Sequence, residues 1–267
     1  MEPIIKLSVL DLSVSAVFIA VLAAIAYRMR LGISRILISS AARAFIQLSL
    51  VGIALKFIFE KSNPLWISLI SVIMLLSAAR EVYGRQKRKH SGASGFMMGA
   101  LPLMVSSFTI TILALTIIIK IKPWYTPQYA IPLLGMLLGN TMTGIALGLD
   151  RLSQGAWDRK DEIEARLMLG HKAQDAISEI KKDSIRSAMT PIINSMSVAG
   201  LVSLPGMMTG QILGGNPPME AVKYQILIIF LIACASGFGV IIAVHASSAR
   251  LFDVRQRLRL DRLKTDR

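Results

Sequence analysis

The chain of 267 residues has little of what soluble enzymes and secreted proteins usually carry. Its single cysteine, Cys234, excludes an internal disulfide framework, and its three histidines form no H-x-x-x-H pair. Charged residues make up only 17% of the chain, and no convergent set of acid, base or metal-ligand residues indicates an enzyme. The phosphate-binding pattern G-x-x-x-x-G-K-[ST] is also absent from the sequence, so we expect that this chain does not hydrolyse ATP.

Apolar residues dominate instead, at 54% of the chain with a mean hydropathy of +0.58. Several apolar runs approach the roughly 20 residues that cross a bilayer as a helix. We therefore predict an all-α polytopic membrane protein, with residues 1–267 forming a single permease domain of about seven spans. The predicted spans are 7–27, 39–59, 64–79, 98–120, 128–150, 187–213 and 222–246.

The distribution of basic residues predicts how these spans are oriented. Of the 30 Lys and Arg residues, 23 lie in segments 28–38, 80–97, 151–186 and 247–267. By the positive-inside rule these segments are cytoplasmic and the N-terminus is outside, in a cell membrane. The net charge of +14 is then a topology signal, and we expect no nucleic-acid partner. We expect the basic tail 247–267 to bind acidic lipid headgroups.

The loop 151–186 contains an amphipathic stretch between two apolar spans. Ile163, Leu167, Gly170, Ile177 and Ile180 fall near helical spacing and form one apolar stripe among charged residues. Gly170 favours the end of one helix and a turn of the chain. The stripe predicts a helix that packs on a partner, on the membrane surface, or as an extension of the neighbouring spans.

The spacing within this loop resembles the EAA loop of ABC-importer permeases, which docks into a groove on the ATPase subunit. The matching positions are Glu164-Ala165-Arg166, Gly170 and Ile180. Two departures are Arg166, where the pattern has a second alanine, and Lys181-Lys182, where it has x-Leu-Pro. The resemblance implies a cytoplasmic coupling helix between spans 5 and 6, with contacts from Glu164, Ala165, Arg166, Leu167, Gly170, Ile177 and Ile180.

Longer stretches resemble the FetB/YbbM family of ABC transporter permeases. They are ARAFIQLSLVGIALKFIF (42–59), IPLLGMLLGN (131–140), and DSIRSAMTPIINSMSVAGLVSLPGMMTGQILGG (183–215) followed by AVKYQI. That family includes a bacterial iron-export permease and the membrane half of plant aluminium-tolerance ABC transporters. The resemblance implies a permease subunit without a cofactor of its own.

The same resemblance implies partners and a substrate class. A separate cytoplasmic ATPase would bind ATP and Mg²⁺, and a second copy of this chain would complete the pathway for a metal ion or a metal-linked solute. The coupling loop is importer-like whereas the family exports, so the sequence leaves the direction of transport open. A secondary transporter or channel without an ATPase is the alternative, although the spans hold few of the ionisable residues that such proteins use.

Four polar residues inside the spans are candidates to line a path. Arg43 and Gln47 are four residues apart and share one face of span 2. Arg43 either lines the path or extends its charge to the cytoplasmic headgroups. Asn140 and Asn194 lie deeper, where they form hydrogen bonds between helices or contact substrate.

Spans 5 and 6 share an irregularity towards their outer halves, which predicts a hinge or an outer vestibule. Methionine thioethers suit a soft ion such as Cu(I), but methionine also fills gaps in apolar cores, so the sequence assigns no metal ligands. The candidate gate residues are Pro132, Met136, Pro205, Gly206, Met207 and Met208.

Small residues recur every four positions in two spans. The repeats are Gly135-x-x-x-Gly139, Gly144-x-x-x-Gly148 and Ala235-x-x-x-Gly239-x-x-x-Ala243. Such repeats favour close helix packing, either within the chain or across a dimer.

Overall fold

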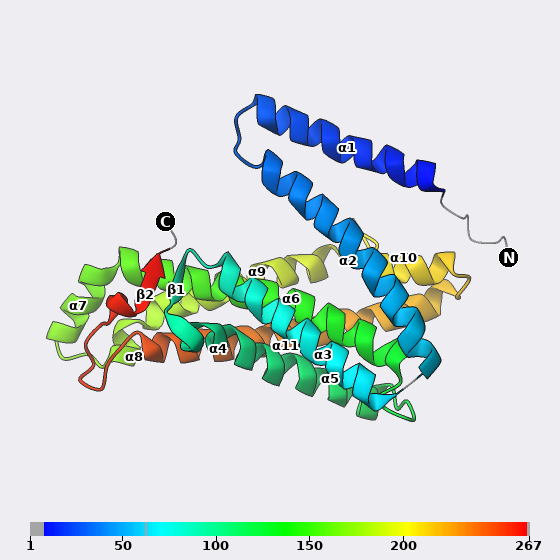
Figure 1. Cartoon of the computed structure of the whole chain (residues 1–267). Coiled ribbons are helices and arrows are strands. Elements are labelled where there is room, and N and C mark those ends of the chain that lie inside the picture. The colour runs from blue at the N-terminus through cyan, green and yellow to red at the C-terminus, as the bar shows by residue number, and fades with distance from the viewer. Residues whose placement is uncertain (1–7, 62, 266–267) are drawn as a thin grey trace. The chain divides into compact units, whose positions relative to one another are not determined.

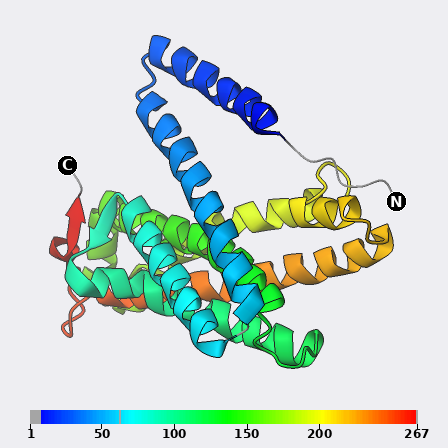
Figure 2. The same cartoon turned by 45° about the vertical axis from the view of Figure 1, so that its right-hand side comes forward.

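The computed structural model describes residues 8–61 and 63–265, which are mostly helical as predicted (Figures 1 and 2). By its internal contacts the chain divides into two compact units: α1 with α2, and the elements from α3 onward apart from residues 213–215. The single permease domain stays a prediction. Within the described ranges, six helical stretches are long and apolar enough to cross a membrane. They are Leu10–Arg28, Ser34–Phe59, Pro64–Arg85, Gly92–Ile118, Pro127–Asp158 and Pro218–Arg250.

The first unit consists of α1 (Val9–Arg28) and α2 (Ser34–Lys61). Ser8 and Asp11 cap the start of α1 reciprocally. The Asp11 amide donates to Ser8 Oγ at 3.3 Å, and the Ser8 amide donates to Asp11 Oδ2 at 2.8 Å. Most apolar side chains of this unit are exposed within it, as expected for helices that face lipid or other protein.

In the second unit, five helical passages lie side by side (Figures 1 and 2). The fully buried side chains of α6 and α11, among them Leu137, Leu149 and Val244, place these two helices at its centre. The passages are α3 (Pro64–Arg85); α4 (Gly92–Leu103) with η1 (Met104–Phe108), α5 (Thr109–Leu113) and η2 (Ala114–Ile118); α6 (Pro127–Asp158); α9 (Ser178–Val198) with α10 (Gly206–Leu213); and α11 (Pro218–Arg250).

The predicted span 187–213 is two helices in the structure. α9 ends at Val198, and the chain turns at Gly200, whose φ is +84° and whose amide donates to the Ser203 carbonyl. Pro205 then precedes α10, where a proline disfavours helical geometry in the residue before it. The six long helical stretches correspond to six of the seven predicted spans. The broken pair α9–α10 lies at the seventh, which is not among the stretches long and apolar enough to cross a membrane in the described part of the chain.

Three of the predicted cytoplasmic segments meet at one end of the second unit. We call this the basic end; it comprises residues 86–91, 151–178 and 251–265. It contains β1 (Arg88–His90), α7 (Lys160–Met168), α8 (Ala173–Ala176), η3 (Leu260–Arg262) and β2 (Leu263–Thr265). β1 pairs with β2 in antiparallel register, and the Ala173 amide at the start of α8 donates to Gln256 Oε1 at 2.9 Å. The orientation of this end in the membrane stays a prediction of the positive-inside rule.

The C-terminal tail lies on the protein itself, although we expected it to bind lipid headgroups. Arg262 Nη1 donates to the Arg250 carbonyl at 2.8 Å, and the Ser91 amide donates to the Arg262 carbonyl at 3.1 Å. Leu251, Phe252 and Leu263 are buried in the main apolar core. The tail is therefore a structural part of the basic end, because its apolar residues have a core to enter.

Glycines let α6 and α11 approach each other closely. A Cβ atom on Gly144 would lie 3.0 Å from Val240 Cγ2, and one on Gly239 would lie 2.7 Å from Thr141 Cγ2. A Cβ on Gly139 would meet nothing within 4 Å. The repeats at Gly144 and Gly239 therefore serve packing within the chain, whereas Gly139 does not take part in it.

This packing predicts different outcomes for alanine at two glycines of α11. We expect Gly239→Ala to lower the free energy of unfolding by about 1–3 kcal/mol, because the new methyl group clashes with Thr141. Gly237→Ala is the matched control, since its Cβ lies 3.4 Å from the flexible end of Met189 and alanine favours the helix. Thermal unfolding of the purified protein in detergent measures both, and equal melting temperatures would contradict the packing role of Gly239.

Candidate functional site

The helix pair α7–α8 forms a hairpin at the basic end, and Gly170 makes the turn between the two helices. Its φ is +87°, a conformation that side chains with a Cβ rarely adopt. The Gly170 amide donates to the Leu167 carbonyl at 3.0 Å, and the His171 amide donates to the Arg166 carbonyl at 3.1 Å. These two bonds form a Schellman cap, so the helix ends at Gly170 as the sequence predicted.

The apolar stripe of this hairpin faces the core of the chain itself, which corrects our expectation that it meets a partner. Ile177 is 0% exposed, and Ile163 and Ile180 are also buried. Ile180 packs directly on α6, because a Cβ on Gly155 would lie 2.8 Å from Ile180 Cγ2. Leu167 is half-buried against the same core. Ile177 and Ile180 therefore fix the hairpin to the second unit and are not free to dock.

The exposed apolar surface of the hairpin is Met168 and Leu169, which we call the tip. Met168 is 83% exposed and Leu169 is 80% exposed, immediately before Gly170. Helical periodicity did not select these residues, because they lie outside the stripe. Their signal in the sequence is two consecutive large apolar residues directly before a helix-ending glycine, in a polar loop.

Four charged residues link the hairpin to α9. Arg159 donates to Glu162 at 2.7 Å and to Glu179 at 3.2 Å, and Arg166 lies 2.8 Å from Glu162 and 3.1 Å from Glu179. The hydrogen bond from Arg159, together with the charges of both arginines, lowers the pKa of Glu162. Arg166, the departure from the EAA pattern, thus bridges α7 and α9. Glu164 pairs with Lys160 at 3.7 Å, and Ala165 is exposed.

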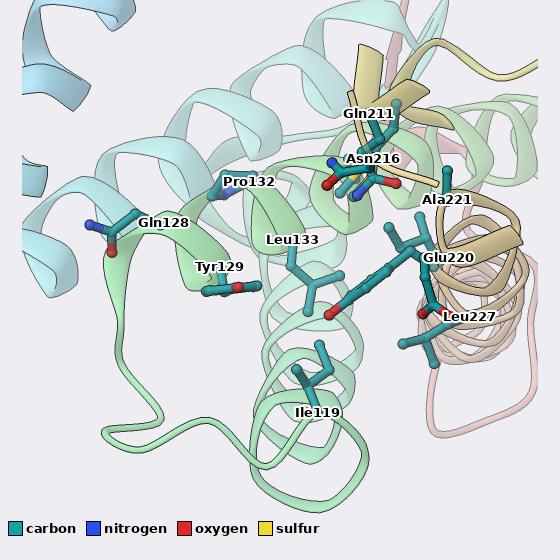
Figure 3. Close-up of a pocket in the computed structure, with 14 residues that line it drawn as sticks. Ile119, Gln128, Tyr129, Pro132, Leu133, Gln211, Asn216, Glu220, Ala221 and Leu227 are labelled. Carbon is teal, nitrogen blue, oxygen red and sulfur yellow. The ribbon is translucent and has the colours of Figure 1, made fainter. Parts of the chain in front are cut away.

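A cavity of about 380 Å³ lies towards the other end of the second unit, between α6, α10 and α11 (Figure 3). It brings together Pro132 and Met136 from α6 with Met207 from α10, so the two predicted irregularities do share one site. Pro205, Gly206 and Met208 lie beside Met207 in sequence but outside the lining. No cluster of three His, Cys, Asp or Glu side chains suited to a metal ion occurs among the described residues.

Polar residues that sequence reasoning missed also line this cavity. Gln211, Asn216, Glu220 and Tyr224 surround it, and Glu220 pairs with Lys223 at 2.7 Å. Gln211 Oε1 is buried without a hydrogen-bond partner in the described part of the chain. Only Glu220, beside Pro217-Pro218 at the start of the last apolar run, could have been noticed in the sequence. The cavity offers amide, phenol and carboxylate oxygens beside two thioethers.

Within residues 8–61 and 63–265, the four predicted polar path residues form no hydrogen bond to another helix. Arg43 and Gln47 are exposed one turn apart on α2, within the first unit. Asn140 Nδ2 donates to the Met136 carbonyl of its own helix at 2.8 Å, which corrects the expected interhelical bond. Asn140 and Asn194 are both exposed at the surface of the second unit.

His90 holds the basic end together from within. It is buried, and its Nε2 lies 3.0 Å from Ser247 Oγ of α11. Its carbonyl would lie 2.0 Å from a Cβ on Gly95, so only glycine fits there. Burial, followed by the charges of Arg250 and Arg262, lowers the pKa of His90 from 6.5 to about 4.

Comparison with known proteins identifies relatives over nearly the whole chain. The sequence profile of the uncharacterised protein family UPF0014 matches residues 9–252. The UPF0014 membrane protein slr1647 of Synechocystis is 37% identical over 222 residues, which is 83% of this chain and 85% of that protein. The "Probable iron export permease protein FetB" of Escherichia coli is 32% identical over 256 residues, or 96% of this chain and 95% of that protein.

A plant relative has a similar degree of identity. The protein ALUMINUM SENSITIVE 3 of Arabidopsis thaliana is 32% identical over 223 residues, which is 83% of this chain and 80% of that protein. No solved structure matches the chain.

The buried neutral His90 predicts a loss of stability in mild acid. Because its pKa is about 4 when folded and 6.5 when unfolded, its contribution is present above pH 6.5 and is lost as the pH falls towards 4. Between pH 7.5 and pH 5.0 the loss is about 2 kcal/mol. We expect His90→Gln to lose this part of the pH dependence of the melting temperature. His171→Gln, at an exposed histidine of the same end, is the control. An unchanged pH dependence in His90→Gln would contradict this role.

Proposed function

Because the chain belongs to the UPF0014 family of membrane proteins, we propose that it is the permease subunit of an ATP-driven ABC transporter. We infer that it exports a metal ion or a metal-linked solute, since one relative is named a probable iron export permease and another ALUMINUM SENSITIVE 3. The sequence has no phosphate-binding loop, so ATP and Mg²⁺ would bind to a partner ATPase subunit. This chain is then a transport component and not an enzyme.

The observation that carries the coupling proposal is the exposed tip on a hairpin that buried residues and ion pairs hold against the second unit. Two adjacent large apolar side chains that are at least 80% exposed, at the turn of a hairpin, are typical of residues that enter a pocket on a partner. The partner would be the cytoplasmic ABC ATPase, with Met168 and Leu169 in its groove. Glu164 and Ala165, on the neighbouring turn of α7, would lie at the rim of this contact.

The contacts behind the tip suggest how its movement would reach the cavity. Arg159 and Arg166 tie α7 to Glu179 of α9, so a force on the hairpin moves α9. α9 leads through the break at residues 199–205 to α10, and Met207 of α10 lines the cavity. Helix breaks of this kind are typical hinges, so ATP-driven motion of the tip would open or close the cavity through α10.

Exposed polar residues in the middle of α6 and near the end of α9 support a homodimer. They include Asn140, Thr143, Asn194 and Ser195 of the second unit. Asn140 and Thr143 lie far from both ends of α6. Polar side chains at membrane depth face protein or a water-filled path and avoid lipid. A second copy of the chain would enclose such a path between the two subunits.

Substitution of the tip tests the docking. The chain is expressed with an ABC ATPase that is encoded in its gene neighbourhood and lacks membrane spans of its own, and the two are co-purified. We expect Leu169→Asp to reduce the bound ATPase by about tenfold or more, because a charge cannot enter an apolar pocket without a large cost. The membrane insertion of the variant stays intact, because Leu169 is outside the core.

The matched control is Val254→Asp, which places the same charge at another fully exposed apolar residue of the basic end. We expect this variant to retain the ATPase. Equal retention in both variants would refute docking through the tip.

In proteoliposomes that contain the complex, ATP hydrolysis measured with a panel of Fe, Mn, Cu and Al salts tests the substrate class. Uphill transport by this chain without any ATPase would refute the proposed function itself.

A further inference from the structure

A second, smaller pocket lies between α6, α9 and α11, halfway along the bundle. Its volume is about 100 Å³. Asn140, Thr143 and Ser195 surround its exposed mouth, and Ser236 of α11, only 3% exposed, lies at its buried floor. These residues are roughly 20 Å or more from either end of α6 and α11. The pocket is therefore distinct from the cavity between α6, α10 and α11.

Each polar group at the mouth donates one hydrogen to its own helix, which leaves only the Asn140 amide with a further N–H. Asn140 Nδ2 donates to Met136, Thr143 Oγ1 to Gly139 and Ser195 Oγ to Pro191, each to a backbone carbonyl of its own helix. A hydroxyl group has a single hydrogen, so Thr143 and Ser195 can offer only lone pairs to a further ligand. The mouth of the pocket thus presents oxygen acceptors.

The hydroxyl group at the floor is unsatisfied. Ser236 Oγ is buried and has no hydrogen-bond partner among the residues that the structure describes. A buried hydroxyl without a partner costs about 1–3 kcal/mol, so such groups in native proteins normally bind water or an ion. Ser236 lines the pocket, so a ligand in the pocket would supply the missing partner.

The size and charge of the pocket limit this ligand. A volume of about 100 Å³ is well below the roughly 300–1,000 Å³ of sites for drug-sized ligands, so the pocket suits water, an ion or a very small solute. No carboxylate of the described chain lines it, so the charge of a divalent or trivalent ion would stay uncompensated at this depth. Oxygen acceptors without a negative charge suit a monovalent cation that keeps part of its water.

We propose that this pocket binds a monovalent alkali cation, held by the side-chain oxygens of Asn140, Thr143, Ser195 and Ser236. The site joins α6, α9 and α11, and Ser195 lies only three residues before α9 ends at Val198. Bound cation therefore stabilises the end of α9 against the two central helices, directly before the break that leads to α10. The cation differs from the proposed cargo, so the inference goes beyond the proposed function, although the mouth of the pocket faces the path that we propose between two subunits.

The test is a cation titration of the purified full-length chain in detergent, without an ATPase. The melting temperature is measured in NaCl or KCl against choline chloride at constant ionic strength, and ²²Na⁺ binding is measured directly by scintillation proximity. We expect saturable ²²Na⁺ binding that unlabelled Na⁺ or K⁺ displaces. We also expect the melting temperature to rise by about 5 °C at saturation.

Matched serine variants locate the site. Ser195 and Ser197 lie on the same helix and each donates at 2.9 Å to the carbonyl four residues earlier, but only Ser195 lines the pocket. We expect Ser195→Ala and Ser236→Ala to weaken cation binding by about tenfold, and Ser197→Ala to bind like the unchanged chain. Ser236→Ala removes an unsatisfied hydroxyl, so the variant folds at least as well without cation.

Four results would overturn the proposal. Equal stabilisation by choline would show an effect of ionic strength alone, and stronger stabilisation by Mg²⁺ or Ca²⁺ would show a different ligand. Identical ²²Na⁺ binding in all three variants would show that Na⁺ binds elsewhere on the chain. Absence of ²²Na⁺ binding by the unchanged chain would show a pocket that holds only water. Each result leaves the docking of the ATPase untouched, because no ATPase is present in this experiment.

Discussion

The close approach of α6 and α11 is the constraint on which the second unit depends. Gly144 and Gly148 of α6 meet the side chains of Val240 and Val244, and Gly239 of α11 meets Thr141. In lipid, helices gain little from hydrophobic burial against each other, so their association rests on close van der Waals packing, which small residues permit. With this pair fixed, α9 packs on both helices and the other passages surround them.

This central pair also determines where polar groups can lie. The cavity at the end near α10 and the pocket around Ser236 both lie on α6 and α11, on the side where α9 and α10 cover them. α9 is less apolar than α6 and α11 and is followed by a break. It lines the pocket around Ser236, whereas α10 lines the larger cavity. The helices α6 and α11 thus form the packed centre of the second unit, and the less apolar, interrupted passage α9–α10 forms a wall of each pocket.

The sequence predicted the positions of the helices well, because apolar runs of sufficient length report directly on membrane spans. It also predicted the turn at Gly170 and the shared location of Pro132, Met136 and Met207. It predicted an irregularity at Pro205–Gly206, but not that α9 already ends at Val198, since proline also occurs inside continuous helices here, as Pro132 and Pro191 show. The pairing of β1 with β2 joins residues about 170 positions apart and leaves no local pattern.

The hairpin shows why an amphipathic pattern does not by itself identify a docking surface. A stripe such as Ile163, Ile177 and Ile180 reports only that one face is buried, and the chain's own core is the nearest place to bury it. A partner can use only what remains exposed after the chain has folded, which in the proposed docking is the pair Met168 and Leu169 at the turn. A coupling element must hold its position against its own body while its contact surface stays free. The buried stripe, together with the bridge from Arg166 to Glu179, meets the first requirement, and the exposed tip meets the second.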